Sequence, residues 1–263
     1  MSHQPRVLAA AIVLLFAVGC FEIEETIELK KDLSGTASFK IGVDMEPMIA
    51  IMAKVQKEMS GDTAALTADD IAKARAEFKK NAKKSSSTTA DPRAEAEKGL
   101  PPGVKLLDAT IAEREFGMTT TMKFAFENLS SLVGVKLGSG GGEGGDPTKK
   151  TVIESPFEGL EVIETDKTIS LRAKPQNPAE EVKADAKEQA PQIDPETEKL
   201  MNDAFKSLRV AWKITAPFEV VSHNATRVEG KTLIWEYDLE RFQKLAAAGA
   251  KADELGVHVT YRK

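Results

Sequence analysis

Paired segments in which apolar and polar residues alternate at every second position restrict the fold of this chain more than any other feature. Alternation of this kind places successive side chains on opposite faces of a β-strand. The first pair covers residues 21–30 and 36–45, and Glu25 interrupts the apolar stripe of its first member. Two further pairs, at 104–128 and 159–174, follow the same pattern. Neighbours of this kind form hairpins, so we expect an antiparallel β-sheet built from hairpins.

Segments with helical spacing lie between these pairs. Apolar residues recur every three or four positions in 47–59, in 67–78 and in 195–208, which is the period of an amphipathic helix. Thr67 and Asp70 resemble a capping box at the start of the second helix. The fold class that follows is α+β, with several helices packed on one face of the sheet.

The remaining C-terminal sequence predicts a strand, a turn and a strand within 208–242, a helix over 239–249 and a last strand over 256–263. We expect one domain over residues 20–263, because no linker separates two complete patterns. Three polar or glycine-rich stretches predict flexible insertions within it. They lie near residues 81–99, 138–150 and 174–193.

The chain begins with an apolar run, Val7 to Cys20, that ends in its one cysteine. The run is shorter than the roughly 20 residues that a membrane-spanning helix needs, and the only side-chain charge before it is Arg6. These features are typical of a secretory signal peptide, here residues 1–19. The tetrapeptide "AVGC" that closes the run resembles the lipobox of bacterial lipoproteins. The resemblance implies cleavage before Cys20 and acylation of its thiol and of the new amino terminus.

An acylated first residue would make the membrane a partner of the chain through an N-terminal lipid anchor. The chain would then be localised in the cell envelope, facing the periplasm or the exterior. In Gram-negative lipoproteins, an Asp directly after the lipidated cysteine resembles a signal that retains the protein in the inner membrane. Phe21 stands at that position here, which permits transfer to an outer membrane.

Two motifs resemble the LppM-like family of bacterial lipoproteins. One is the hairpin that directly follows the cysteine, with the turn "KDLSG". The other is a late segment in which Pro217, Val220 or Val221, Asn224, Gly230 and Trp235 match the family's spacing. The family prefers Asn-Gly where this chain has "NAT". The resemblance implies an α+β domain suited to lipids or other apolar ligands, and it assigns no enzyme activity.

Composition excludes several classes of function. The chain is 41% hydrophobic and 29% charged, which is a globular balance. Removal of Arg6 with the signal peptide leaves 35 Lys and Arg against 41 Asp and Glu, a net charge of −6 that argues against nucleic acid as a partner. The histidines are His3, His223 and His258, and neither an HExxH nor a CxxC motif occurs. We therefore expect no enzyme activity, no metal site and no cofactor.

The largest apolar side chains of the predicted sheet are the candidates for contact with a ligand. An apolar ligand such as a lipid could lie between the sheet and the helices, and the alternative is that these rings only fill the core. A second hypothesis is an envelope interaction or structural protein that contacts another envelope protein and has no small-molecule ligand. The candidate ligand-binding residues are Phe124, Phe126, Trp212, Trp235 and Tyr237.

The lipobox yields a direct test. We expect Cys20→Ser to abolish labelling of the protein by a palmitate analogue and to leave the precursor uncleaved, because the acylated thiol is gone. Metabolic labelling followed by mass spectrometry of the N-terminus measures both effects. Continued labelling of the variant at wild-type level would contradict lipidation at Cys20.

Overall fold

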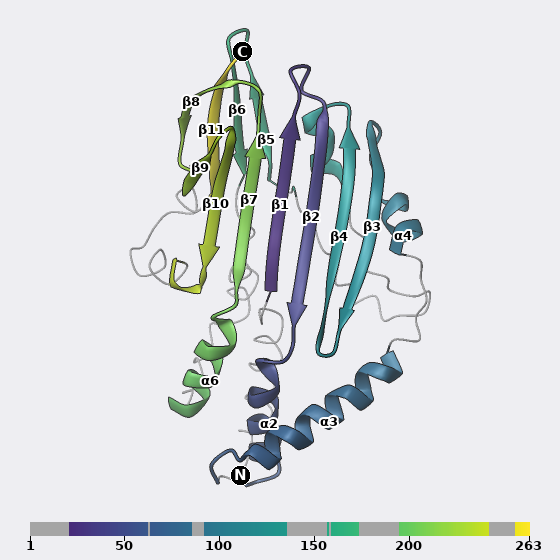
Figure 1. The fold of residues 1–263 in the computed structure, drawn as a ribbon, viewed down its shortest axis with the longest axis vertical. Helices are drawn as coiled ribbons and strands as arrows, with labels where there is room; N and C mark the ends of the chain where they lie inside the picture. The colour runs from purple at the N-terminus through teal and green to yellow at the C-terminus, as the bar shows by residue number, and fades with distance from the viewer. Residues whose placement is uncertain are drawn as a thin grey trace, which may run out of the picture.

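A computed structural model describes residues 21–62, 64–85, 92–135, 157, 159–173, 195–241 and 256–263. A seven-stranded sheet dominates it, and the strands run side by side in the order β3-β4-β2-β1-β7-β10-β9 (Figure 1). The α+β class is confirmed. The strands of this sheet are β1 (Phe21–Leu29), β2 (Gly35–Asp44), β3 (Val104–Arg114), β4 (Gly117–Phe126), β7 (Arg209–Thr215), β9 (Arg227–Glu229) and β10 (Thr232–Asp238).

The two predicted long hairpins form as expected and join into one half of the sheet. β1 pairs with β2, β2 with β4, and β4 with β3, all antiparallel. At the tight β1–β2 turn Leu33 has φ 64°, and Ser34 donates from its backbone N–H to the Asp32 carboxylate at 3.1 Å. A Cβ on Gly35 would lie 2.0 Å from the Glu28 carbonyl oxygen, so only glycine fits where this turn closes.

The second half of the sheet joins the first through a parallel pair. β7 lies beside β1 in parallel, and β10 continues the sheet on the other side of β7. The sequence predicted only a strand, a turn and a strand over 208–242. The structure instead places four strands there, because the chain between β7 and β10 first adds a strand to a second sheet and then returns as β9.

That second sheet has four strands in the order β5-β6-β11-β8. The predicted hairpin at 159–174 forms β5 and β6, and its tip is at Thr165 to Lys167. The C-terminal strand lies between β6 and β8 and is antiparallel to both. Its members are β5 (Glu161–Glu164), β6 (Thr168–Ala173), β8 (Glu219–His223) and β11 (Val257–Arg262).

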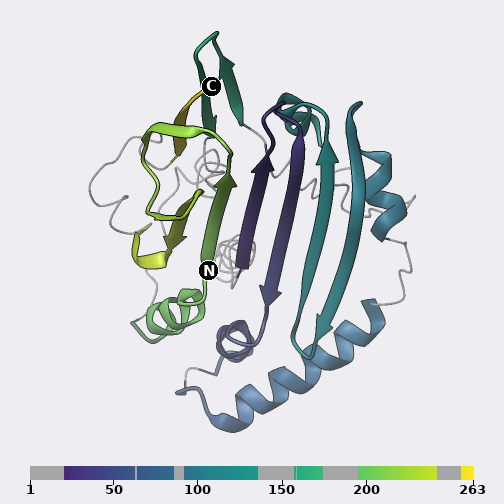
Figure 2. The ribbon, with the colours of Figure 1, turned by 45° about the horizontal axis from the view of Figure 1, so that its top comes forward.

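Three helices lie beyond one end of the large sheet, as both views of the ribbon show (Figures 1 and 2). They are α2 (Met48–Met59), α3 (Ala68–Ser85) and α6 (Pro195–Phe205). This is the end where β1 and β7 begin and where β2 stops. We call it the Phe21 end. The shorter α4 (Pro92–Lys98) and the 3₁₀ helix η1 (Leu129–Gly134) complete the described helices.

The predicted capping box is confirmed at the start of α3. The Thr67 hydroxyl accepts from the backbone N–H of Asp70 at 3.2 Å, and the Asp70 carboxylate accepts from the N–H of Thr67 at 2.9 Å. The helix then continues to Ser85, past its predicted end at 78. Helix therefore occupies residues 81–85 and 92–98 of the stretch predicted as a flexible insertion. The insertions near 138–150 and 174–193 lie outside the described residues, as does Cys20.

One hydrophobic core unites the two sheets. Buried side chains from β1, β2, β4, β7 and β10 pack with Ile169 and Leu171 of β6 and with Val259 and Tyr261 of β11. The helices at the Phe21 end form two separate, smaller apolar clusters. One joins α2 to α6, and the other joins α2 to α3 and to Phe116 in the β3–β4 turn. These three helices thus extend the sheet lengthwise, whereas α4 and η1 contribute Ala96, Leu129 and Leu132 to the main core.

Asn224 connects the two sheets. Its side-chain oxygen accepts from the Trp235 indole N–H at 2.6 Å and from the backbone N–H of His258 at 2.9 Å, and its amide donates to the Gly256 carbonyl at 2.9 Å. Leu33 is the one non-glycine residue with positive φ in the described part of the chain, so Asn224 acts through its side chain and not through a left-handed backbone. Gly230, with φ 61°, lies in the turn between β9 and β10.

We expect Asn224→Ala to lower the free energy of unfolding by about 3 kcal/mol, because three hydrogen bonds of about 1 kcal/mol each are lost. Urea denaturation followed by tryptophan fluorescence measures this change. Asn202→Ala on the exposed face of α6 is the matched control, and it should leave stability within about 0.5 kcal/mol of wild type. A similar small effect for Asn224→Ala would show that the two sheets do not depend on this residue.

Candidate functional site

The inner face of the large sheet, the face that packs on the core, consists of cross-strand rows of side chains. Residues that are directly opposite in register share a face, so each row can be read from the pairing. The row through Ile27 contains Phe124, Ala37, Ile214 and Leu233, and all of them are buried. The row through Glu25 contains Met122, Phe39, Trp212 and Trp235.

Two further rows continue the inner face toward the Phe21 end, and they remain apolar while their burial declines. None of their apolar members except Tyr237 is fully buried, and Met118 is 47% exposed. Ile111, the partner of Thr120 on the edge strand β3, is 44% exposed. We call these the Phe21-end rows. They comprise Thr120, Ile41, Ile23, Val210 and Tyr237 in one row, and Met118, Val43 and Phe21 in the other.

The decline in burial has a structural cause. η1 follows the far end of β4, and its Leu129 and Leu132 are buried in the main core together with residues of the second sheet. These elements cover the rows that lie toward the β1–β2 turn. The helices at the Phe21 end pack mainly on one another. The Phe21-end rows therefore lie between the main core and the helical clusters. Among the described elements, neither the core nor the clusters bury these rows completely.

The five candidate ligand residues are brought together and are buried: four lie in the filled rows, and Tyr237 is the one fully buried apolar member of the Phe21-end rows. Phe124 and Phe126 come from β4, Trp212 from β7, and Trp235 and Tyr237 from β10. Their exposed fractions are between 0% and 5%. Trp235 and Tyr237 share one sheet face, as their spacing predicted, and Tyr237 donates to the Gly256 carbonyl at 3.4 Å. Contact between these rings and a ligand stays a prediction.

Sequence reasoning did not single out the half-buried aliphatic residues Ile23, Ile41, Val43 and Val210. The alternation did place each of them on the apolar side of its strand. It could not show which rows the rest of the chain covers, since coverage depends on where η1 and the second sheet pack. The signal that was available is Glu25, the one acidic residue in the apolar stripe of β1.

Glu25 is a buried acid on the inner face. Its side chain lies between Phe39 of β2 and Trp212 of β7 in register and is 6% exposed. Its Oε2 atom is buried and has no hydrogen-bond partner in the described structure. Burial raises the pKa of this carboxyl well above its ordinary range. The Glu25 row lies at the boundary between the filled core and the Phe21-end rows. The buried Oε2 atom of Glu25, which has no hydrogen-bond partner among the described residues, thus lies at that boundary.

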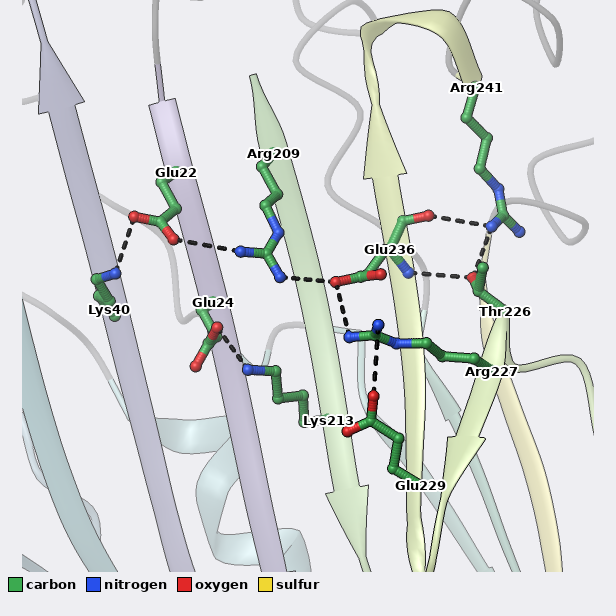
Figure 3. A network of polar contacts seen from close by, with 10 residues as sticks. All are labelled: Glu22, Glu24, Lys40, Arg209, Lys213, Thr226, Arg227, Glu229, Glu236 and Arg241. Carbon is green, nitrogen blue, oxygen red and sulfur yellow. Dashed lines mark hydrogen bonds and ion pairs between the residues drawn. The ribbon is translucent and has the colours of Figure 1, made fainter. Parts of the chain in front are cut away.

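The outer face of the same strands is polar, and its charges are paired (Figure 3). Glu22 accepts from Lys40 at 2.8 Å and lies 3.7 Å from Arg209, which itself pairs with Glu236 at 2.6 Å. The hydrogen bond from Lys40 holds the pKa of Glu22 below its ordinary value. Lys213 pairs with Glu24 at 2.7 Å. These contacts cross from β2 through β1 and β7 to β10 and hold the strands in register.

The two described histidines lie in the second sheet, on β8 and β11. His223 accepts at Nδ1 from the backbone N–H of Ala225 at 3.1 Å, and His258 lies on β11 beside Asn224. No group of three or more His, Cys, Asp or Glu side chains suited to a metal ion occurs among the described residues. Within the same residues, no helix is both long enough and apolar enough to cross a membrane.

The raised pKa of Glu25 predicts a pH-dependent stability. The folded state keeps its proton at pH values above 4.5 where the unfolded state loses it, so the free energy of unfolding falls as pH rises. The loss is about 1.4 kcal/mol per pH unit until the folded pKa is reached. In Glu25→Gln this loss should be absent, so its stability advantage over wild type should grow between about pH 5 and pH 7.

Urea denaturation at several pH values checks this difference. Glu28→Gln is the matched control, because Glu28 lies on the same strand but is exposed, and its curve should run parallel to that of wild type. A Glu25→Gln curve that also runs parallel to wild type would contradict a buried, protonated Glu25.

Comparison with known proteins gives a structural similarity but no sequence match. No protein-family model and no curated protein matches the chain. Among solved structures, the chain is similar to the folded domain of the Mycobacterium tuberculosis protein LppM, determined by NMR, with 10% sequence identity. The similarity covers 93% of this chain and 89% of that chain, with a TM-score of 0.37. A TM-score this low does not establish a shared fold, so the function proposed below depends on the residues of this chain alone.

Proposed function

We propose that the chain is a lipid-anchored envelope lipoprotein that binds a lipid or another apolar ligand and performs no catalysis. One observation carries the ligand role. The inner sheet face stays apolar through the Phe21-end rows while the described elements cease to cover it there. A half-buried apolar surface continuous with a core is suited to contact with an apolar ligand.

An anchor on Cys20 would lie at the same end of the sheet as the half-buried rows. Cys20 directly precedes Phe21 in the sequence, and Phe21 is the first residue of β1. Because β1 lies centrally in the large sheet, acyl chains on Cys20 would hold the Phe21 end of the sheet at the membrane surface. The β1–β2 turn lies at the opposite end of these strands.

The residue types of the Phe21-end rows support binding without chemistry. Val43, Ile41, Ile23 and Val210 offer only aliphatic surface, and each methylene of a ligand buried there contributes about 0.8 kcal/mol. The nearest ionisable group on this face that is buried is Glu25, and a single carboxyl without a partner base or nucleophile does not make a catalytic pair.

Filling the half-buried rows should block the ligand. We expect Val43→Trp to weaken binding of a fluorescent alkyl-chain probe by about tenfold or more, because the indole takes the space of about two ligand methylenes. Thr119→Trp is the matched control, since Thr119 lies at the same end of the sheet beside Gly42 but on the outer face. Titration of the full chain in phosphatidylcholine nanodiscs, with empty nanodiscs subtracted, measures both affinities.

Two results would count against this function. Equal binding by the two tryptophan variants would place the ligand elsewhere on the protein. Absence of any saturable signal with wild type would favour the alternative, an envelope interaction or structural protein without a small-molecule ligand.

A further inference from the structure

We propose that Glu25 is the polar contact of the inner-face site, and that the ligand is a single-chain amphiphile whose polar group donates a hydrogen bond to the Glu25 carboxyl. An alkyl alcohol and an alkyl amine both have this chemistry. The inference rests on the proposed function, because it needs an apolar ligand at the Phe21-end rows. To that function the inference adds the chemical class of the ligand and the residue that discriminates between polar groups of the ligand.

The pairing of the other acids on β1 sets Glu25 apart. Glu22 and Glu24 pair with lysines on neighbouring strands, and Glu28 accepts from the Thr36 hydroxyl at 3.0 Å. Those three side chains lie on the outer face, where water also reaches them. Glu25 alone among the acids of β1 is buried, and its Oε2 atom has no hydrogen-bond partner in the described structure. A buried acceptor without a partner is costly, so a donor supplied by a ligand gains more there than in water.

The position of Glu25 matches an amphiphile that lies along the strands. Beyond Glu25, toward the β1–β2 turn, the inner face is filled by the row through Ile27. In the other direction the rows are mostly apolar and half-buried over the four residue steps from Glu25 to Phe21, about 13 Å along the strand. An alkyl chain of ten carbons is comparable in length. Its polar group would meet Glu25 while its chain covers Ile23 and Val43.

The surroundings of the carboxyl select among polar groups. A ligand carboxylate has acceptor atoms only, so it cannot supply the donor that the Glu25 oxygen lacks, and its own negative charge would lose water in apolar surroundings. A hydroxyl or an amine supplies the missing donor. An amine has the same donor in its neutral form, and as an ammonium it would form an ion pair with Glu25 once the carboxyl has lost its proton.

Three probes with the same chain length test this selection. They are 1-decanol, decylamine and decanoate, titrated by tryptophan fluorescence into the full chain in phosphatidylcholine nanodiscs, with empty nanodiscs subtracted. We expect wild type to bind the alcohol and the amine about tenfold more tightly than decanoate, which is the value of one hydrogen bond to a buried acid. The pH dependence of the two preferred probes separates an alcohol ligand from an amine ligand.

Two substitutions of Glu25 and one control decide the role of the carboxyl. Glu25→Leu fills the same space without an acceptor and should remove the preference, so that all three probes bind within about threefold of one another. Glu25→Gln keeps an acceptor oxygen and should still bind decanol about as tightly as wild type, while its two N–H donors should improve the binding of decanoate. Glu28→Leu changes an outer-face acid of the same strand and should behave as wild type. Circular dichroism verifies that each variant is folded.

The failure of this inference is distinguishable from the failure of the proposed function. If decanoate binds wild type as tightly as decanol, or if Glu25→Leu keeps the preference, Glu25 does not contact the ligand. If Val43→Trp still blocks all three probes in that case, the apolar site stands and only its polar contact is wrong. If no probe gives a saturable signal with wild type, the ligand-binding function fails and this inference fails with it.

Discussion

The parallel pairing of β1 with β7 is the contact on which the rest of the structure depends. It joins the hairpins of the N-terminal half to the C-terminal strands and so completes a seven-stranded sheet. Its register sets Trp212 beside Glu25 and Ile214 beside Ile27, which produces the continuous rows of the inner face. The same register brings Lys213 to Glu24, 189 positions away in the sequence, and Arg209 to Glu22. A shift by one residue would exchange the apolar and charged faces of β7, so burial on one side strongly favours this register.

Acidic side chains have different surroundings on the two faces of this sheet. On the outer face the carboxylates are paired with Lys or Arg and are partly exposed, so each pair contributes little stability by itself and serves mainly to match neighbouring strands. On the inner face Glu25 lies among aromatic neighbours, and its Oε2 atom is buried without a hydrogen-bond partner in the described structure. A buried carboxyl in that state lowers stability at neutral pH, and a donor from a ligand would offset that cost. The same residue can therefore weaken the empty protein and select what binds to it.

The position of the candidate site is set by where the main core ends on the inner face of the sheet. η1 and the second sheet fill the inner face near the β1–β2 turn, while α2, α3 and α6 form their own clusters beyond the opposite end. Lys79 of α3 pairs with Glu115, and Phe78 lies 6.1 Å from Phe116 between ring centroids, so α3 is fixed to the β3–β4 turn. An acylated Cys20 would bring this same end to the bilayer. Ligand site and anchor would then share one surface of the domain.

The sequence by itself determined the α+β class, the three hairpins, the capping box at Thr67 and Asp70, and the shared face of Trp235 and Tyr237. Each of these depends on residues close together in the chain, where alternation and turn or cap chemistry act directly. It also marked Glu25 as an exception within an apolar stripe.

Only the tertiary structure decided that β1 pairs with β7, that β8 and β9 divide the C-terminal strands between two sheets, and that Asn224 joins those sheets. It also decided which apolar rows are filled, so that the predicted aromatic residues lie in the core and Ile23, Ile41, Val43 and Val210 line its half-buried end. These features are set by contacts between segments distant in sequence, and a local pattern carries no information on which segment covers which face.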